Sequence, residues 1–219
     1  MPEVNFAITD KLDNIAGLSP TILSELLDGS FLGYKVKKLS DIKKSDLHKL
    51  PKEAYLTIEY TRGSPYKRSE VKYVAKEIMK KYHFDGKITG SYRRKKSKLN
   101  DIDILTTSSP FNVYDDKDTI VIRQGDVRIK ILFKPKNYKE YFPIDILFTT
   151  KDRYPFALMH FTGSKEFNIH MSKHAIAMGM KLSVNGLYKN GVLVKDIKSE
   201  KDIFTHLKLK YIPPEKRNN

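Results

Sequence analysis

The sequence predicts an α+β fold, in which a region of strands lies between two largely helical regions. Residues 1–68 have the pattern of short helices joined by loops. Five short apolar segments typical of strands follow, at residues 87–90, 102–106, 119–123, 127–134 and 144–149. From Tyr154 the pattern becomes helical again. A chain of 219 residues is long enough for one domain or a few small subdomains.

The first region contains a turn of the helix-hairpin-helix kind. Residues Ile15, Gly17, Leu18 and Ser19 precede Pro20 and the helical pattern Thr21–Leu27. Such a turn offers backbone N–H groups to a DNA phosphate, so these four residues are predicted to bind DNA. The usual pattern has a second glycine where Ser19 stands, and an ordinary helical hairpin is the alternative.

The middle region begins after a turn at residues 62–65. An apolar stripe then predicts an amphipathic helix, formed by Val71, Val74, Ala75, Ile78 and Met79. The five strand segments follow. The loop 108–118 carries Asp115, Asp116 and Asp118, which we expect to be solvated.

The last region should begin with a helix over 156–161. Ser164 is placed to cap a helix that runs to about Met178 and ends at Gly179. A small hairpin is predicted from residues 181–184 and 187–194, with Asn190–Gly191 as its turn. Ser199 and Asp202 have the spacing of a capping box at the start of a final helix.

Composition indicates a polyanionic partner. The chain has 41 Lys and Arg against 26 Asp and Glu, a net charge of +15, which favours nucleic acid over a membrane, although a solvated lysine-rich surface is the alternative. There is no cysteine, which excludes disulfides and cysteine-based zinc sites. With no leader pattern or long apolar run, we expect a soluble intracellular protein in the nucleus or cytoplasm, or in a viral factory if the chain is viral.

The segment from Gly90 to Asp103 carries the strongest chemical signal. Gly90 and Ser91 open a turn beside Arg94, and such donors suit phosphate oxygens. In a strand, Asp101 and Asp103 point to the same side, and a carboxylate pair suits Mg²⁺. A two-metal site needs a further acid from a neighbouring strand. Asp145 lies in such a strand, so the pattern predicts a metal–nucleoside triphosphate site.

These motifs resemble the family X DNA polymerases, of the DNA polymerase beta type. The resemblance covers residues 86–214 strongly and 12–85 faintly, and it rests on Gly90–Arg94, Asp101–Asp103, Ile144–Ile146, Tyr154–Ser164, Phe167–Asn168, His174–Ala175, Ser199–Phe204 and Lys210–Pro214. It implies a nucleotidyltransferase palm with a mixed or antiparallel sheet. The implied division is a DNA-binding subdomain at 1–68, the palm at 69–150 and a nucleotide-selecting subdomain at 151–219.

The resemblance also implies roles for the site residues. Asp101, Asp103 and Asp145 would be catalytic and would hold two Mg²⁺ ions, with Mn²⁺ as a substitute. Gly90 and Ser91 would contact the γ-phosphate and Arg94 the β-phosphate, whereas Arg93 would be structural. Further nucleotide contacts would come from His160, Phe161, Gly163 and Asn168. The turn at 15–19 would hold a monovalent cation.

Some positions depart from the family pattern. Ser172 and Pro143 stand where the family has arginines, and Lys165 stands where it has an acidic residue. Each change removes or reverses a charge near the new base pair, so low fidelity is a hypothesis. Lys165 and Lys173 are predicted to bind DNA.

The predicted function is a Mg²⁺-dependent, template-directed DNA polymerase that adds dNTPs to a primer 3′-OH. We expect a monomer without a lyase domain that fills short gaps in DNA repair, on primer–template or gapped DNA and without a membrane partner. One alternative is a template-independent nucleotidyltransferase, of the terminal transferase or RNA-tailing type. A further alternative is a non-catalytic module that binds DNA ends.

Overall fold

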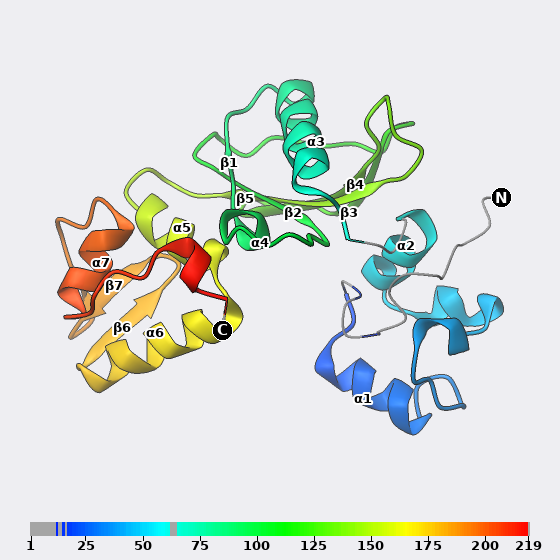
Figure 1. The fold of residues 1–219 in the computed structure, drawn as a ribbon, viewed down its shortest axis with the longest axis horizontal. Coiled ribbons are helices and arrows are strands. Elements are labelled where there is room, and N and C mark those ends of the chain that lie inside the picture. The colour runs from blue at the N-terminus through cyan, green and yellow to red at the C-terminus, as the bar shows by residue number, and fades with distance from the viewer. Residues whose placement is uncertain (1–11, 13–14, 16, 62–64, 219) are drawn as a thin grey trace.

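The fold consists of three consecutive subdomains, each with its own hydrophobic core. A computed structural model describes residues 12, 15, 17–61 and 65–218. We call residues 12–61 the N-terminal subdomain, 65–150 the central subdomain and 151–218 the C-terminal subdomain. Separate clusters of buried apolar side chains fill the three. Figure 1 shows the N-terminal and C-terminal subdomains at opposite ends of the central one.

The central subdomain is a five-stranded mixed sheet, which confirms the predicted fold class. Its strand order is β1-β2-β5-β4-β3, and only β2 and β5 pair in parallel among these strands. The strands are β1 (Lys87–Ile88), β2 (Ile102–Thr106), β3 (Thr119–Arg123), β4 (Arg128–Phe133) and β5 (Phe142–Phe148). All five predicted strands are present. The first is shorter than expected, because Gly90 begins helix α4 (Gly90–Arg93).

Helix α3 (Arg68–Lys81) covers one face of this sheet. Its predicted stripe is correct, since Val71, Val74, Ala75 and Ile78 are fully buried. They pack against the isoleucines of the strands, at positions 102, 104, 129, 131, 144 and 146. Burying each of these larger side chains is worth about 1.5–3 kcal/mol. The strength of this contact fixes which face of each strand turns away from α3.

The N-terminal subdomain is helical, as predicted. It contains α1 (Pro20–Asp28), the 3-10 turns η2 (Leu39–Asp41) and η3 (Lys44–Lys49), and α2 (Lys52–Tyr60). Ser19 caps α1, because its hydroxyl accepts a hydrogen bond from the Ile22 amide. Most of the chain before Gly17 lies outside the described residues, so the first helix of the predicted hairpin cannot be placed against it.

The C-terminal subdomain combines helices with a small sheet. Its elements are α5 (Tyr154–Thr162), α6 (Lys165–Ala177), β6 (Met180–Ser183), β7 (Gly186–Lys189), β8 (Val192–Leu193), α7 (Glu200–His206) and η4 (Pro214–Lys216). The predicted caps are correct: the Ser164 hydroxyl accepts from the Phe167 amide, and Ser199 with Asp202 forms a capping box.

One detail of this region differs from the prediction. Residues 187–194 do not form a single arm of a hairpin. They divide into β7 and β8, so the sheet has three strands in the order β6-β7-β8. Asn190–Gly191 is a turn as expected, but it joins β7 to β8. Both residues have positive φ, 51° and 78°, which suits a two-residue hairpin turn.

Two carboxylates of the loop 108–118, which we expected to be solvated, also form contacts within the protein. Asp116 forms an ion pair with Lys81 at 2.7 Å, and Asp115 accepts a hydrogen bond from the Val121 amide at 2.6 Å. These contacts connect the loop to α3 and β3.

Among the helices of the described residues, none has the length and apolar character needed to cross a bilayer.

Candidate active site

The three predicted carboxylates lie on the face of the sheet opposite α3. Asp103 on β2 is directly paired with Asp145 on β5, and Asp101 comes one residue before β2 begins. Because side chains alternate along a strand, burial of the isoleucines at 102, 104, 144 and 146 turns the aspartates to the other side. Leu105 and Leu147 continue that face and pack against α5. The acids therefore lie at the junction with the C-terminal subdomain.

Burial and the repulsion between neighbouring carboxylates raise the pKa values of Asp101 and Asp103. The pKa of Asp103 is raised well above its usual range, by burial and by the charges of Asp101 and Asp145. The pKa of Asp101 is raised by desolvation in the cleft and by the charge of Asp145. A bound cation would relieve this repulsion. As the side chains stand, no three acidic or histidine groups within the described ranges are close enough to hold one metal ion.

The turn at Gly90 lies directly against this acidic pair. Gly90 has φ of +53°, and a β-carbon there would collide with the Asp103 carboxylate. The Thr89 amide also donates to the Asp103 carbonyl oxygen at 2.8 Å. A glycine is therefore required for the backbone to pass this close. Ser91 follows in the same turn, half-buried at the edge of a cavity.

That cavity has a volume of about 880 Å³, within the range of pockets that bind small ligands. The central subdomain contributes the Gly90 turn and two of the acids, and the C-terminal subdomain contributes α5, α6 and their junction. Every predicted nucleotide-binding residue lines it: Gly90, Ser91, Arg94, His160, Phe161, Gly163 and Asn168. Asp101 and Asp103 also line it, whereas Asp145 is not among its lining residues.

Several of the lining side chains are already bonded to protein. Arg94 donates to the Thr162 carbonyl oxygen at 2.5 Å and to Asn218 at 3.1 Å. Burial lowers the pKa of the Arg94 guanidinium despite the nearby aspartates. The Asn168 amide donates to the His160 carbonyl oxygen at 2.7 Å. These bonds fix α5 and α6 beside the turn.

Comparisons with known proteins agree with this arrangement. The family profile described as "DNA polymerase beta thumb" matches residues 157–218. The chain is 30% identical over 138 residues to the DNA polymerase/3'-5' exonuclease PolX of Bacillus subtilis, covering 59% of this chain and 24% of that protein. It is 27% identical over 167 residues to the repair DNA polymerase X of African swine fever virus, covering 69% and 87%.

In sequence, the chain is therefore similar to family X DNA polymerases. The fold agrees, because the crystal structure of Leishmania infantum polymerase beta in a ternary P/T complex superposes with a TM-score of 0.68. That match has 22% sequence identity and covers 95% of this chain and 97% of the other. The chain spans only about a quarter of the length of the Bacillus subtilis relative, in contrast to most of the viral one.

Arg93, beside the phosphate-binding turn predicted from the family, is engaged inside the protein. It donates to both oxygens of Glu200, at 3.0 and 2.5 Å, and to the Thr162 hydroxyl at 2.6 Å. Arg217 donates to Glu200 from the other side, at 2.7 Å. This buried Arg93–Glu200–Arg217 group joins the central subdomain to the C-terminal one, so Arg93 has the structural position expected for it.

Asp145 has two basic partners that were not predicted from the sequence. Arg128 donates to both oxygens of its carboxylate, at 2.9 and 2.6 Å. Lys130 lies 3.9 Å from the same carboxylate and also forms an ion pair with Glu53 on α2. The available signal was the alternation of Arg128 and Lys130 with isoleucines in a predicted strand, which places both basic groups on one face.

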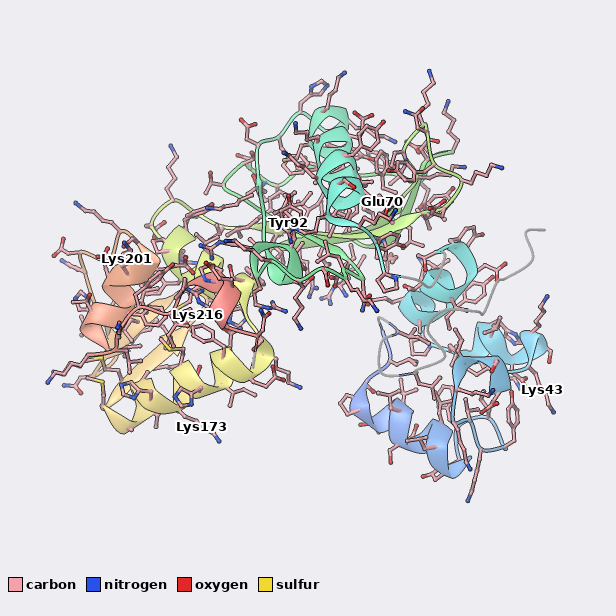
Figure 2. The ribbon with its side chains drawn as sticks, in the orientation of Figure 1. Lys43, Glu70, Tyr92, Lys173, Lys201 and Lys216 are labelled. Atoms are coloured by element: carbon pink, nitrogen blue, oxygen red, sulfur yellow. The ribbon has the colours of Figure 1, made fainter. Side chains whose placement is uncertain are left out.

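The predicted DNA-binding residues are divided between the flanking subdomains. Ile15 is buried, so its side chain packs in the core and only its backbone could reach a ligand. Gly17 has φ of +87°, and a β-carbon there would lie 2.7 Å from the β-carbon of Glu53. Leu18 and Ser19 complete this turn. Lys165 and Lys173 are exposed on α6, where Figure 2 labels Lys173 far from Lys43 of the N-terminal subdomain.

Proposed function

We propose that the chain is a Mg²⁺-dependent, template-directed DNA polymerase that adds dNTPs to a primer 3′-OH. We further propose that it acts as a monomer and fills short gaps during DNA repair. The single observation that carries the proposal is the pairing of Asp103 with Asp145, with Asp101 alongside, at the edge of the cavity formed by the Gly90 turn and α6. The names of the viral and bacterial relatives support it.

The donor set fits a divalent metal. Asp103 and Asp145 lie on neighbouring strands, with Asp101 one residue before the first of them, and burial together with the charges of Asp101 and Asp145 raises the pKa of Asp103. These three residues would hold Mg²⁺, or Mn²⁺ as a substitute. When bound, the metal would neutralise the triphosphate and lower the pKa of the primer hydroxyl.

The chain's own residues would position the triphosphate. The Gly90 turn and the Ser91 hydroxyl would donate to the γ-phosphate. Arg94 would donate to the β-phosphate, because its guanidinium has five N–H groups and only two hydrogen bonds hold it to Thr162 and Asn218. Holding the reacting phosphate in place is the main contribution that a protein makes to this chemistry.

The C-terminal subdomain would contact the sugar and base. Burial lowers the pKa of His160, so its ring is neutral near pH 7 and adds no charge beside the base. Phe161 and Gly163 would pack on the sugar. Asn168 would probe the minor-groove edge of the new base. Ser172 is half-buried on the same helix and is too short to replace the arginine of the family pattern, which supports low fidelity as part of the proposal.

DNA would contact both flanking subdomains. The turn of Ile15, Gly17, Leu18 and Ser19 would bind a backbone phosphate and a monovalent cation on one side. Lys165 and Lys173 would bind the template on the other. The net charge of +15 would strengthen this contact and make it salt-dependent.

Primer extension on three substrates tests the proposal: a one-nucleotide gap, an open template and single-stranded DNA, each with dNTPs or rNTPs. We expect templated addition of dNTPs on the first two and none on the third. Asp145→Ala should abolish extension while DNA affinity stays within a few-fold. Asp126→Ala, in an exposed loop next to the same strands, is the matched control and should extend normally.

The same assay distinguishes the alternatives. Addition to single-stranded DNA without regard to template would indicate a terminal transferase, and addition of rNTPs to RNA would indicate a tailing enzyme. DNA binding with no incorporation under any condition would indicate a non-catalytic module. Full activity of Asp145→Ala would refute the assignment of the carboxylates.

A further inference from the structure

Asp145 is the one of the three carboxylates that is fully engaged by a positive side chain. Arg128 on β4 donates two hydrogen bonds to this carboxylate, from Nε to Oδ1 at 2.9 Å and from Nη2 to Oδ2 at 2.6 Å. Such a two-point contact is the strongest form of an arginine–carboxylate pair. The Asp145 side chain is 12% exposed and the Arg128 side chain is 41% exposed, so water reaches the pair from the arginine side.

The strand register places this pair within the candidate metal site. Lys130 lies opposite Asp145 across β4 and β5, and Arg128 is two residues away on the same face. Lys130 Nζ is 3.9 Å from Asp145 but forms its closer ion pair with Glu53. Arg128 is therefore the cation that satisfies Asp145, and no second arginine in the described part of the chain contacts this carboxylate.

The hydrogen bonds from Arg128 hold Asp145 in an orientation in which it does not line the cavity. Asp101 and Asp103 line the cavity, but Asp145 is not among its lining residues. The guanidinium occupies one lone pair on each Asp145 oxygen, so a metal ion must either displace it or bind at the remaining lone pairs, next to a positive charge. The charge of Arg128 also opposes the approach of a second cation.

We propose that Arg128 is an internal counter-cation that competes with the divalent metal for Asp145. In the metal-free enzyme it occupies both oxygens of the carboxylate that does not line the cavity. A divalent ion that binds Asp145 then displaces the guanidinium. The inference rests on the proposed function only in assigning Asp145 as a metal ligand. Arg128 is a positioning residue, because it acts on the metal through Asp145.

Direct Mn²⁺ binding, followed by the electron paramagnetic resonance signal of free Mn²⁺ without DNA or nucleotide, tests this. Arg128→Gln removes the charge and the grip, and we expect Mn²⁺ to bind about three- to tenfold more tightly. Arg128→Lys keeps the charge but cannot donate two parallel hydrogen bonds, so its Mn²⁺ affinity should lie between those of the unmodified protein and Arg128→Gln. Arg123→Gln, an exposed arginine at the end of neighbouring β3, is the matched control and should leave the affinity unchanged.

The Asp145→Asn background shows whether the effect passes through Asp145. In that background, adding Arg128→Gln should not tighten Mn²⁺ binding. The proposal is overturned if Arg128→Gln leaves the affinity unchanged or weakens it, or if Arg123→Gln or the Asp145→Asn background gives the same gain. If Arg128→Gln does not fold, an Arg128→Lys affinity no tighter than that of the unmodified protein overturns it. Lack of Mn²⁺ binding by every variant would also do so.

The binding test is separable from the proposed activity. A protein that extends primers but shows no effect of Arg128 on Mn²⁺ binding would refute only the counter-cation role. A protein that binds Mn²⁺ more tightly after Arg128→Gln, but extends no primer, would refute only the polymerase.

Discussion

Replacing Glu200 by glutamine should loosen the junction between the central and C-terminal subdomains. Glu200 accepts hydrogen bonds from Arg93 and Arg217, and the three side chains are 6%, 14% and 0% exposed. The substitution keeps the shape and one acceptor oxygen but removes the only negative charge in contact with the two arginines among the described residues. The two largely buried guanidinium groups then keep only neutral partners among the described residues.

The magnitude follows from this burial. Removing one partner of a buried ion pair costs about 3–5 kcal/mol, and the lower value applies here because Arg93 is slightly exposed and glutamine still accepts a hydrogen bond. For a chain of this size, 1 kcal/mol shifts the thermal midpoint by about 2–4 °C. We therefore expect Glu200→Gln to lower the midpoint by roughly 6–12 °C at pH 7.

Thermal unfolding followed by circular dichroism measures this, with Glu215→Gln as the control. Glu215 pairs with Lys95 at the surface, at 3.5 Å, so its replacement should have no measurable effect. A midpoint of Glu200→Gln within about 2 °C of the unmodified protein would show that the pair contributes little and would refute the reasoning.

The pH dependence gives a second check on the same group. Burial alone would raise the pKa of Glu200, but the hydrogen bonds and charges of Arg93 and Arg217 outweigh it and hold the pKa below its ordinary value. A depressed carboxyl pKa contributes stability that is complete above the unfolded pKa, about 4.3, and is lost as the pH falls through the folded pKa. The difference between Glu200→Gln and the unmodified protein should therefore shrink below about pH 4.3.

Three further predictions concern the candidate site. Asp103→Asn should abolish primer extension. It should also raise the thermal midpoint of the metal-free protein near pH 8, because burial and neighbouring charges make the ionised form of Asp103 unfavourable there. A lowered midpoint would show that the Asp103 charge does not destabilise the fold. Ser172→Arg should increase accuracy by about ten- to a hundredfold in single-nucleotide insertion kinetics over all sixteen pairs, because it restores a donor to the minor groove; uniformly accurate insertion by the unmodified enzyme would refute this. A 5′-phosphorylated gap should be preferred over an open template by only about 1–2 kcal/mol, because only a few charge-assisted hydrogen bonds from the Gly17 turn and nearby lysines would bind the phosphate. A preference above about a thousandfold would mean that a dedicated phosphate pocket exists.

The sequence by itself determined the local structure of the site. The alternation of aspartates with isoleucines at 101–104 and 144–146 decides that the acids face away from the core, because successive side chains in a strand point to opposite faces. The glycine at position 90 similarly marks a place where backbone passes against the Asp103 carboxylate. The helix caps at Ser164 and Ser199 depend only on residues three positions away, so they too were predictable.

Only the tertiary structure decided which of these local features meet. Strand β5 pairs in parallel with β2, although β3 and β4 separate them in the chain, and this non-local choice brings Asp145 beside Asp103. Arg128 contacts Asp145 across the sheet, and Arg93 contacts Glu200 across 107 residues. Local propensity contains no information on such contacts, because their free energy comes from burial and charge pairing that exist only after the subdomains pack together.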